Sequence, residues 1–165
     1  MKAFVTLPTY NESKNIEPLI RSIRSQDPVM GIVVADDDSP DGTWRIVEEI
    51  SKKDPNVYLM KRTVNKGRGA AGADAFRFAL DHQADVVIEM DADFSHDPKH
   101  IPQFLEKIRD FDLIIGSRTI SLAGPAEIQA SEMDYPFLHA LYQTHPWPAC
   151  KGLQFRIPVL STGSA

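Results

Sequence analysis

The stretch GIVVADDDSPDGTW, residues 31–44, carries the pattern that decides the fold. Its first five residues, GIVVA, are apolar and predict a short buried strand. The aspartates that follow form a polar loop, and Asp41, Gly42 and Thr43 offer cap chemistry for a helix over 44–52. The same order of strand, polar loop and helix recurs along residues 1–118. Strands are predicted at 2–7, 31–35, 57–60, 86–90 and 113–115, and helices at 15–25, 44–52, 70–82 and 97–109.

This alternation predicts an α/β fold, with a mostly parallel, doubly wound sheet and helices on both faces. Pro8 is expected to end the first strand, Gly116 to close the fifth, and Pro98 to lie in the first turn of the last helix. Helical spacing predicts two buried faces, one formed by Ile16, Leu19, Ile20 and Ile23, the other by Ala73, Phe76 and Leu80.

Polar and charged residues follow the predicted strands at the ends where parallel sheets bind ligands. The loops are PTYNE at 8–12, DDDSPDG at 36–42, NKGRG at 65–69 and DADFSHD at 91–97. Because the carboxyl ends of parallel strands meet at one edge of a sheet, we expect these loops to converge there.

Length and composition exclude several classes of protein. The chain has 165 residues, which suits one domain, and its lone cysteine, Cys150, excludes an intrachain disulfide framework and a cysteine-rich zinc site. The formal net charge of −5 argues against a nucleic-acid binder. No apolar run approaches the roughly 18 residues that a membrane span needs, and the first residues lack the apolar stretch of a signal peptide. The cytoplasm is therefore the expected location.

Asp91 and Asp93 give the sharpest chemical signal. These two carboxylates flank Ala92 directly after a buried strand, which suits a hard divalent cation such as Mg²⁺ or Mn²⁺. A metal held there could bridge a diphosphate and stabilise its charge as it leaves. The alternative is a loop whose aspartates cap the next helix, which is the role expected for Asp97.

The other three loops leave alternatives open. Asp36, Asp37 and Asp38 could form a metal cluster or a solvated acidic turn, and Asp36 is predicted to contact a nucleotide base or ribose. Tyr10 could stack on a base and Glu12 could bind its edge, or their loop could be only a rigid turn. Lys66 and Arg68, with the neighbouring glycines, could approach phosphates or form a solvated basic turn.

Five motifs occur in order along residues 1–118: PTYNE (8–12), DDDSPDGT (36–43), NKGRGAAGADAFRFAL (65–80), EMDADFSHDP (89–98) and IIGSR (114–118). Together they resemble the polyprenol-phosphate mannosyltransferases, the dolichol-phosphate mannose synthase-like members of the family 2 inverting glycosyltransferases. The resemblance implies a GT-A fold and GDP-mannose as the donor, bound with Mg²⁺ or Mn²⁺. It also implies a polyprenyl or dolichyl phosphate acceptor, and hence a peripheral position at the cytoplasmic face of the membrane.

The resemblance further implies roles for individual residues. Those carried over to the donor nucleotide are Pro8, Tyr10, Glu12, Val34 and Asp36. Those carried over to the metal, the diphosphate and the sugar are Asp91, Ala92, Asp93, Ser95 as a third metal ligand, Arg118, and Lys66 as a weaker phosphate contact. An acceptor phosphate is already an anion at neutral pH, so no residue is assigned as a catalytic base.

Residues 119–165 depart from the family pattern. Members of the family continue with basic amphipathic helices and a late Asp-x-x-Ser-Gly-Phe-Arg-like segment that would hold the acceptor. We therefore expect a donor domain at 1–118 and an atypical, poorly ordered tail at 119–165, in a truncated and impaired enzyme. One alternative is a related transferase that uses UDP-glucose or another nucleotide sugar. A second alternative is a non-catalytic remnant that binds nucleotide sugars.

A frameshift near Arg118 would explain the departure. Back-translating residues 147–158 and reading one nucleotide later permits the segment GLPVKDYSSGFR, which resembles the missing family segment. We predict that the coding sequence, read in that frame, encodes a family-like segment with no stop codon. Sequencing the gene tests this hypothesis, and a stop codon or an unrelated segment in that frame would reject it.

Overall fold

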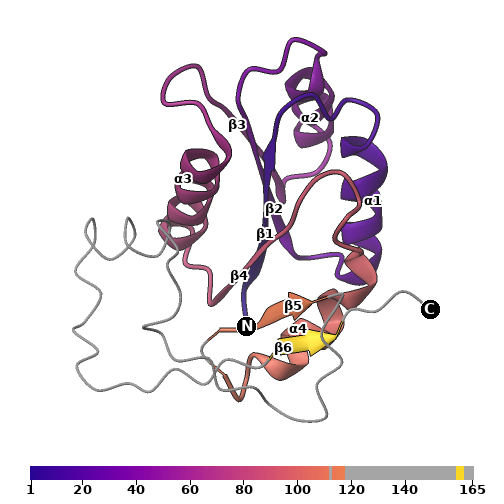
Figure 1. The fold of residues 1–165 in the computed structure, drawn as a ribbon. Helices are drawn as coiled ribbons and strands as arrows, with labels where there is room; N and C mark the ends of the chain where they lie inside the picture. The colour runs from indigo at the N-terminus through magenta and orange to yellow at the C-terminus, as the bar shows by residue number, and fades with distance from the viewer. Residues whose placement is uncertain (112, 118–158, 162–165) are drawn as a thin grey trace. The chain divides into compact units, whose positions relative to one another are not determined.

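The computed structural model describes residues 1–111, 113–117 and 159–161. It divides into two units, residues 1–99 and 100–165, which we describe one at a time. The elements (Figure 1) are β1 Ala3–Thr9, α1 Ile16–Gln26, β2 Gly31–Asp36, α2 Thr43–Ser51, β3 Val57–Lys61, α3 Arg68–Asp81, β4 Val86–Glu89, η1 Pro98–His100, α4 Ile101–Lys107, β5 Ile115–Ser117 and β6 Val159–Ser161. The predicted tail at 119–165 lies outside the described residues except for β6.

A four-stranded parallel sheet forms the centre of the first unit, in the order β3-β2-β1-β4. β1 pairs with β2 on one side and with β4 on the other, so the direction of strand order reverses beside β1. The register sets Thr9 opposite Asp36 and Thr6 opposite Glu89. The carboxyl ends of three neighbouring strands therefore meet at one edge, which confirms the predicted arrangement.

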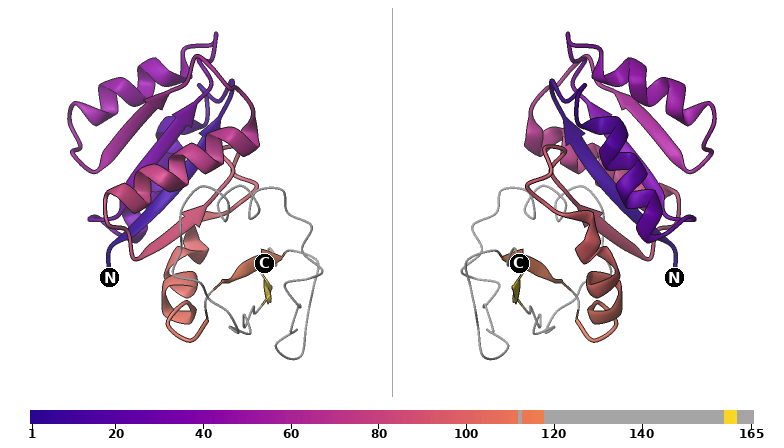
Figure 2. Two further views of the ribbon diagram at one scale, coloured as in Figure 1. Left: turned by 90° about the vertical axis from the view of Figure 1, so that its left-hand side faces the viewer. Right: turned by 90° about the vertical axis from the view of Figure 1, so that its right-hand side faces the viewer.

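Helices cover both faces of this sheet, with α3 on one side and α1 and α2 on the other (Figures 1 and 2). The predicted face of α1 is confirmed, since its buried residues are Ile16, Leu19, Ile20 and Ile23. Because helices cover both faces, the strands consist mostly of apolar residues, as expected for a parallel sheet.

The buried face of α3 differs from the one predicted. Ala71, Ala75 and Ala79 are buried and pack with Phe4 and Val33 of the sheet, whereas Phe76 and Leu80 are only partly buried. The alanines recur every fourth residue, so they form one stripe along the helix. Small side chains let the helix lie close to the strands, and this close approach places its first turn beside the sheet edge.

Two prolines shift the predicted boundaries. β1 continues through Pro8 instead of ending there, because β4 pairs with β1 only as far as Thr6, so no ladder bond is lost at the proline. The helix predicted at 97–109 begins as the single turn η1, and α4 starts only at Ile101. Pro102 has no N–H and therefore belongs in the first turn of an α-helix.

The fifth strand also differs from the one predicted. β5 runs over Ile115–Ser117 rather than 113–115, so Gly116 lies inside the strand. It pairs in parallel with β6 in a two-stranded sheet, and within the described residues it is not part of the four-stranded sheet. No helix among the described residues is long and apolar enough to cross a membrane.

Gly31 tests the packing of the sheet against the Phe4 ring. A Cβ at Gly31 would lie 2.4 Å from Cε1 of Phe4. Because overpacking a core costs about 1–3 kcal/mol, we expect Gly31→Ala to lower the free energy of unfolding in urea by that amount. Gly69→Ala is the control, because a Cβ there meets no atom within 4 Å, and it should not lower that free energy. Equal effects of the two changes would contradict the packing.

Candidate functional site

A pocket of about 310 Å³ opens at the carboxyl edge of the four-stranded sheet, where the strand order reverses between β1 and β4. Its lining consists of Pro8, Thr9, Tyr10, Glu12, Asp37, Arg68, Ala71, Asp91, Ala92 and Asp93. Open α/β sheets bind ligands at such a reversal. All four predicted loops contribute to the lining, so their expected convergence is confirmed.

The loop between β1 and α1 is held by side chains from the loop after β2. The backbone N–H of Asn11 donates to Ser39 Oγ at 3.0 Å, and that of Glu12 donates to Thr43 Oγ1 at 2.9 Å. Asn11 has a φ of +62°, in the left-handed region. With the backbone fixed in this way, the Tyr10 side chain remains 58% exposed and accessible to a ligand.

Asp41 extends the same tether. Its carboxylate accepts hydrogen bonds from the backbone N–H of Ser13 at 2.9 Å and from the hydroxyl of Thr43 at 2.6 Å. Burial raises the pKa of Asp41, but the bonds from Thr43 and Ser13 outweigh burial and lower that pKa to about 2. The tether is therefore ionised at neutral pH.

Asp36 ties the end of β1 to the loop after β2 and lies outside the pocket lining. Its side chain is fully buried, and its carboxylate accepts bonds from Thr9 Oγ1 at 3.0 Å and Ser39 Oγ at 2.7 Å. The Ser39 amide donates to the other carboxylate oxygen at 2.8 Å. Both oxygens thus already accept hydrogen bonds within the protein, and the nucleotide contact of Asp36 stays a prediction.

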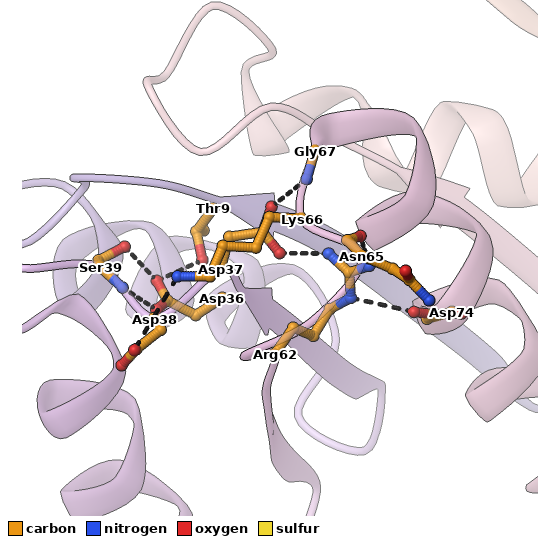
Figure 3. Close-up of polar contacts among 10 residues, drawn as sticks. All are labelled: Thr9, Asp36, Asp37, Asp38, Ser39, Arg62, Asn65, Lys66, Gly67 and Asp74. Atoms are coloured by element: carbon orange, nitrogen blue, oxygen red, sulfur yellow. Dashed lines mark hydrogen bonds and ion pairs between the residues drawn. The ribbon is translucent and has the colours of Figure 1, made fainter.

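Arg62 joins three segments at the edge of the pocket (Figure 3). Its guanidinium pairs with Asp37 after β2, donates to Asp74 of α3 at 3.0 Å, and donates to the carbonyl of Asn65. Asp37 also accepts the backbone N–H of Gly67. Arg62 is 6% exposed, so its charge depends on these partners. Arg62 was not predicted from the sequence as part of the site. A cation close after a predicted apolar strand could have indicated a partner for the aspartates at the neighbouring strand end.

Asp91 faces a cation from α3. Arg68 donates from Nε to Asp91 Oδ1 at 3.2 Å, and its NH2 group pairs with the same carboxylate. The NH2 group also lies 3.5 Å from Glu89 Oε1. The bond to Asp91 raises the pKa of Arg68, and burial raises the pKa of Glu89. Arg68 is therefore the counter-charge of the acidic residues at the end of β4.

Asp93 is ionised and more accessible than Asp91. The backbone N–H of Ser95 donates to Asp93 Oδ1 at 2.8 Å, and the Ser95 hydrogen bonds lower the pKa of Asp93. Phe94 lies between them with a φ of +63°, which is uncommon for a bulky residue and typical of functional loops. Among the described residues, no three acidic, histidine or cysteine side chains form a metal cage. The metal site expected at Asp91 and Asp93 therefore stays a prediction.

The pocket unites most of the residues predicted for the donor. Six of them line it, namely Pro8, Tyr10, Glu12, Asp91, Ala92 and Asp93. Val34 is fully buried within β2 and does not reach the pocket. Lys66 lies 3.9 Å from Asp38 and is not part of the lining, which Arg68 occupies instead. Ser95 lies beside Asp93 without lining the pocket, and Arg118 lies outside the described residues.

The sequence matches the model of the family Glycosyl transferase family 2 over residues 4–155, further along the chain than the five motifs. The chain is 39% identical over 120 residues to the undecaprenyl-phosphate mannosyltransferase of Micrococcus luteus, covering 73% of this chain and 49% of that protein. It is 43% identical over 123 residues to the dolichol-phosphate mannosyltransferase of Pyrococcus furiosus, covering 73% and 34%. The chain thus spans half or less of the length of these relatives.

Solved structures share the fold. A mannosyltransferase from Pyrobaculum calidifontis, in complex with GDP-Man and Mn²⁺, is 26% identical with a TM-score of 0.56, covering 71% of this chain and 35% of that one. TarS 1-349 of S. aureus is also 26% identical, with a TM-score of 0.55, covering 79% and 40%. With the family match, these neighbours confirm the predicted GT-A fold.

The buried Arg62 pair should dominate the stability of the site. Removing one partner of a buried ion pair costs about 3–5 kcal/mol, so Arg62→Met should lower the free energy of unfolding in urea by that amount. Arg21→Met is the matched control, because the Arg21–Glu17 pair is exposed and worth at most about 1 kcal/mol. Similar losses in the two variants would contradict the network.

Proposed function

The chain belongs to glycosyl transferase family 2, and on this premise we propose that it transfers mannose from GDP-mannose to a polyprenyl or dolichyl phosphate. One observation carries the proposal: the pocket between β1 and β4 has Tyr10 and Glu12 from one loop and Asp91 and Asp93 from another. The names of the relatives support mannose as the sugar and a polyprenyl phosphate as the acceptor. The complex of the Pyrobaculum neighbour supports GDP-mannose and a divalent metal.

The charge of the pocket supports a metal-dependent reaction. Arg62 already neutralises Asp37, and Arg68 neutralises Asp91, which leaves Glu12 and Asp93 without an opposing cation in the pocket lining. A nucleoside diphosphate is itself an anion, so this lining would repel it. Asp91 and Asp93 would hold Mg²⁺ or Mn²⁺, with Ser95 as a further oxygen ligand, and the ion would supply the positive charge that the departing diphosphate needs.

The nucleotide end of the donor would lie along the β1 loop. Tyr10 offers an exposed ring for stacking on the base, and Glu12 offers a carboxylate to the edge of the base. Pro8 lines the same pocket. Asp36 would act indirectly, because its bonds to Thr9 and Ser39 hold the loops that carry these groups.

The transfer itself needs orientation more than proton removal. The acceptor phosphate is an anion at neutral pH, so it can attack the anomeric carbon without a general base. A single displacement from the side opposite the diphosphate would invert that carbon. Arg118 would face the donor phosphates or the acceptor phosphate. Because the acceptor is a lipid, the protein would act at the cytoplasmic surface of a membrane.

Calorimetric titration with GDP-mannose, with and without Mn²⁺, tests the donor site. We expect binding that requires Mn²⁺ and that weakens about tenfold or more in Asp93→Asn, because a charged ligand is lost. Asp97→Asn is the matched control: Asp97 lies in the same loop, accepts the N–H of Lys99, and does not line the pocket. This variant should bind like the unchanged protein.

Competition and turnover separate the alternatives. Stronger binding of UDP-glucose than of GDP-mannose would favour a related transferase. Donor binding with no transfer to a polyprenyl phosphate would favour a non-catalytic remnant. We expect turnover to be weak, because residues 119–165 lack the acceptor pattern. A folded sample that binds neither donor would contradict the proposed site.

A further inference from the structure

Arg68 contacts the candidate metal site from outside the loop that forms it. Its Nε lies 3.2 Å from Asp91 Oδ1, and its NH2 group contacts the same oxygen and lies 3.5 Å from Glu89. The guanidinium also lines the pocket. A cation that belongs to the chain is therefore paired with Asp91 in the lining of the pocket.

The backbone of Arg68 is held, whereas its side chain is exposed. Gly67, directly before it, donates its N–H to the buried Asp37, and Arg62 fixes the carbonyl of Asn65 two residues earlier. Arg68 itself is the first residue of α3. Its side chain is 62% exposed, and within the described part of the chain its guanidinium contacts Asp91 and Glu89. The guanidinium can therefore turn without disturbing the loop.

We propose that Arg68 is the resident cation of Asp91 in the metal-free protein, and that it exchanges with the divalent ion and then binds the donor diphosphate. This inference rests on the metal-dependent donor site proposed above. Arg68 has two functions in it: it competes with the metal before the donor arrives, and it adds to the affinity for the donor afterwards.

The energies of the two states favour such an exchange. An exposed ion pair is worth at most about 1 kcal/mol, so the bond between Arg68 and Asp91 is easily broken. The planar guanidinium matches the oxygens of a phosphate, and a charge-assisted bond to a diphosphate is stronger than an exposed pair. The hydrogen bond from Arg68 to the donor diphosphate therefore replaces its ion pair with Asp91.

Mn²⁺ titration without any nucleotide tests the first function. Arg68→Met should bind Mn²⁺ about two- to fivefold more tightly than the unchanged protein, because a competitor worth at most about 1 kcal/mol is removed. Lys99→Met is the matched control, because it also removes one positive charge, from a pair with Asp97 at 2.9 Å. It corrects for the change in net charge, which strengthens the binding of any cation.

Titration with GDP at saturating Mn²⁺ tests the second function. Arg68→Met should bind GDP about tenfold or more weakly, since a charge-assisted hydrogen bond is lost, and Lys99→Met should not. Arg68→Lys should keep part of the competition with Mn²⁺ but lose much of the GDP affinity, because it lacks the planar fork. Opposite signs in one variant are not expected from a merely structural effect.

The outcomes separate this inference from the proposed function. If the unchanged protein binds Mn²⁺ but Arg68→Met binds it no more tightly than Lys99→Met, the exchange is rejected and the metal site stands. Tighter Mn²⁺ binding with unchanged GDP affinity would also reject the exchange. If no variant binds Mn²⁺, both the metal-dependent site and the exchange are rejected. Circular dichroism confirms that each variant is folded.

Discussion

The buried guanidinium of Arg62 is the constraint on which the rest of the site depends. A charge with so little access to water must have partners, and here they come from the loop after β2, the loop after β3 and helix α3. If any one of these segments moved away, the buried charge of Arg62 would lose a partner. One side chain thus fixes the relative positions of Asp37, Gly67 and the start of α3. These in turn fix the backbone position of Arg68, the first residue of α3.

Backbone packing brings this network to the ligand edge. The alanine stripe of α3 permits a close approach to β1 and β2, so the first turn of the helix lies beside the carboxyl ends of the strands. Because the strand order reverses at β1, the loops after β1 and β4 lead away from each other, and the pocket lies between them. The pocket is therefore a consequence of topology, and the side chains determine only which ligand it suits.

The sequence predicted the features that depend on local pattern. The alternation of apolar runs and polar loops predicted the parallel sheet and the convergence of the loops, and the Asp91–Asp93 pair was placed correctly in the pocket. Features that depend on long-range partners were missed. The bond of Asp36 to Thr9 is an example, because partners so far apart in the chain cannot be seen in the sequence. The face of α3 was predicted from Ala73, Phe76 and Leu80, of which only Ala73 is buried, because close packing against the sheet selected small side chains.

The proposed donor binding and the proposed transfer depend on different parts of the chain. Among the described residues, the lining of the pocket and the partners of Arg62 and Arg68 lie within residues 1–99. The contacts proposed for the nucleotide and the metal therefore lie in the first unit. The acceptor phosphate needs its own cationic partners, and the resemblance places Arg118 at the donor phosphates or at the acceptor phosphate. A defect in acceptor binding alone would leave the donor affinity intact, whereas a defect in the Arg62 network would remove both donor binding and transfer.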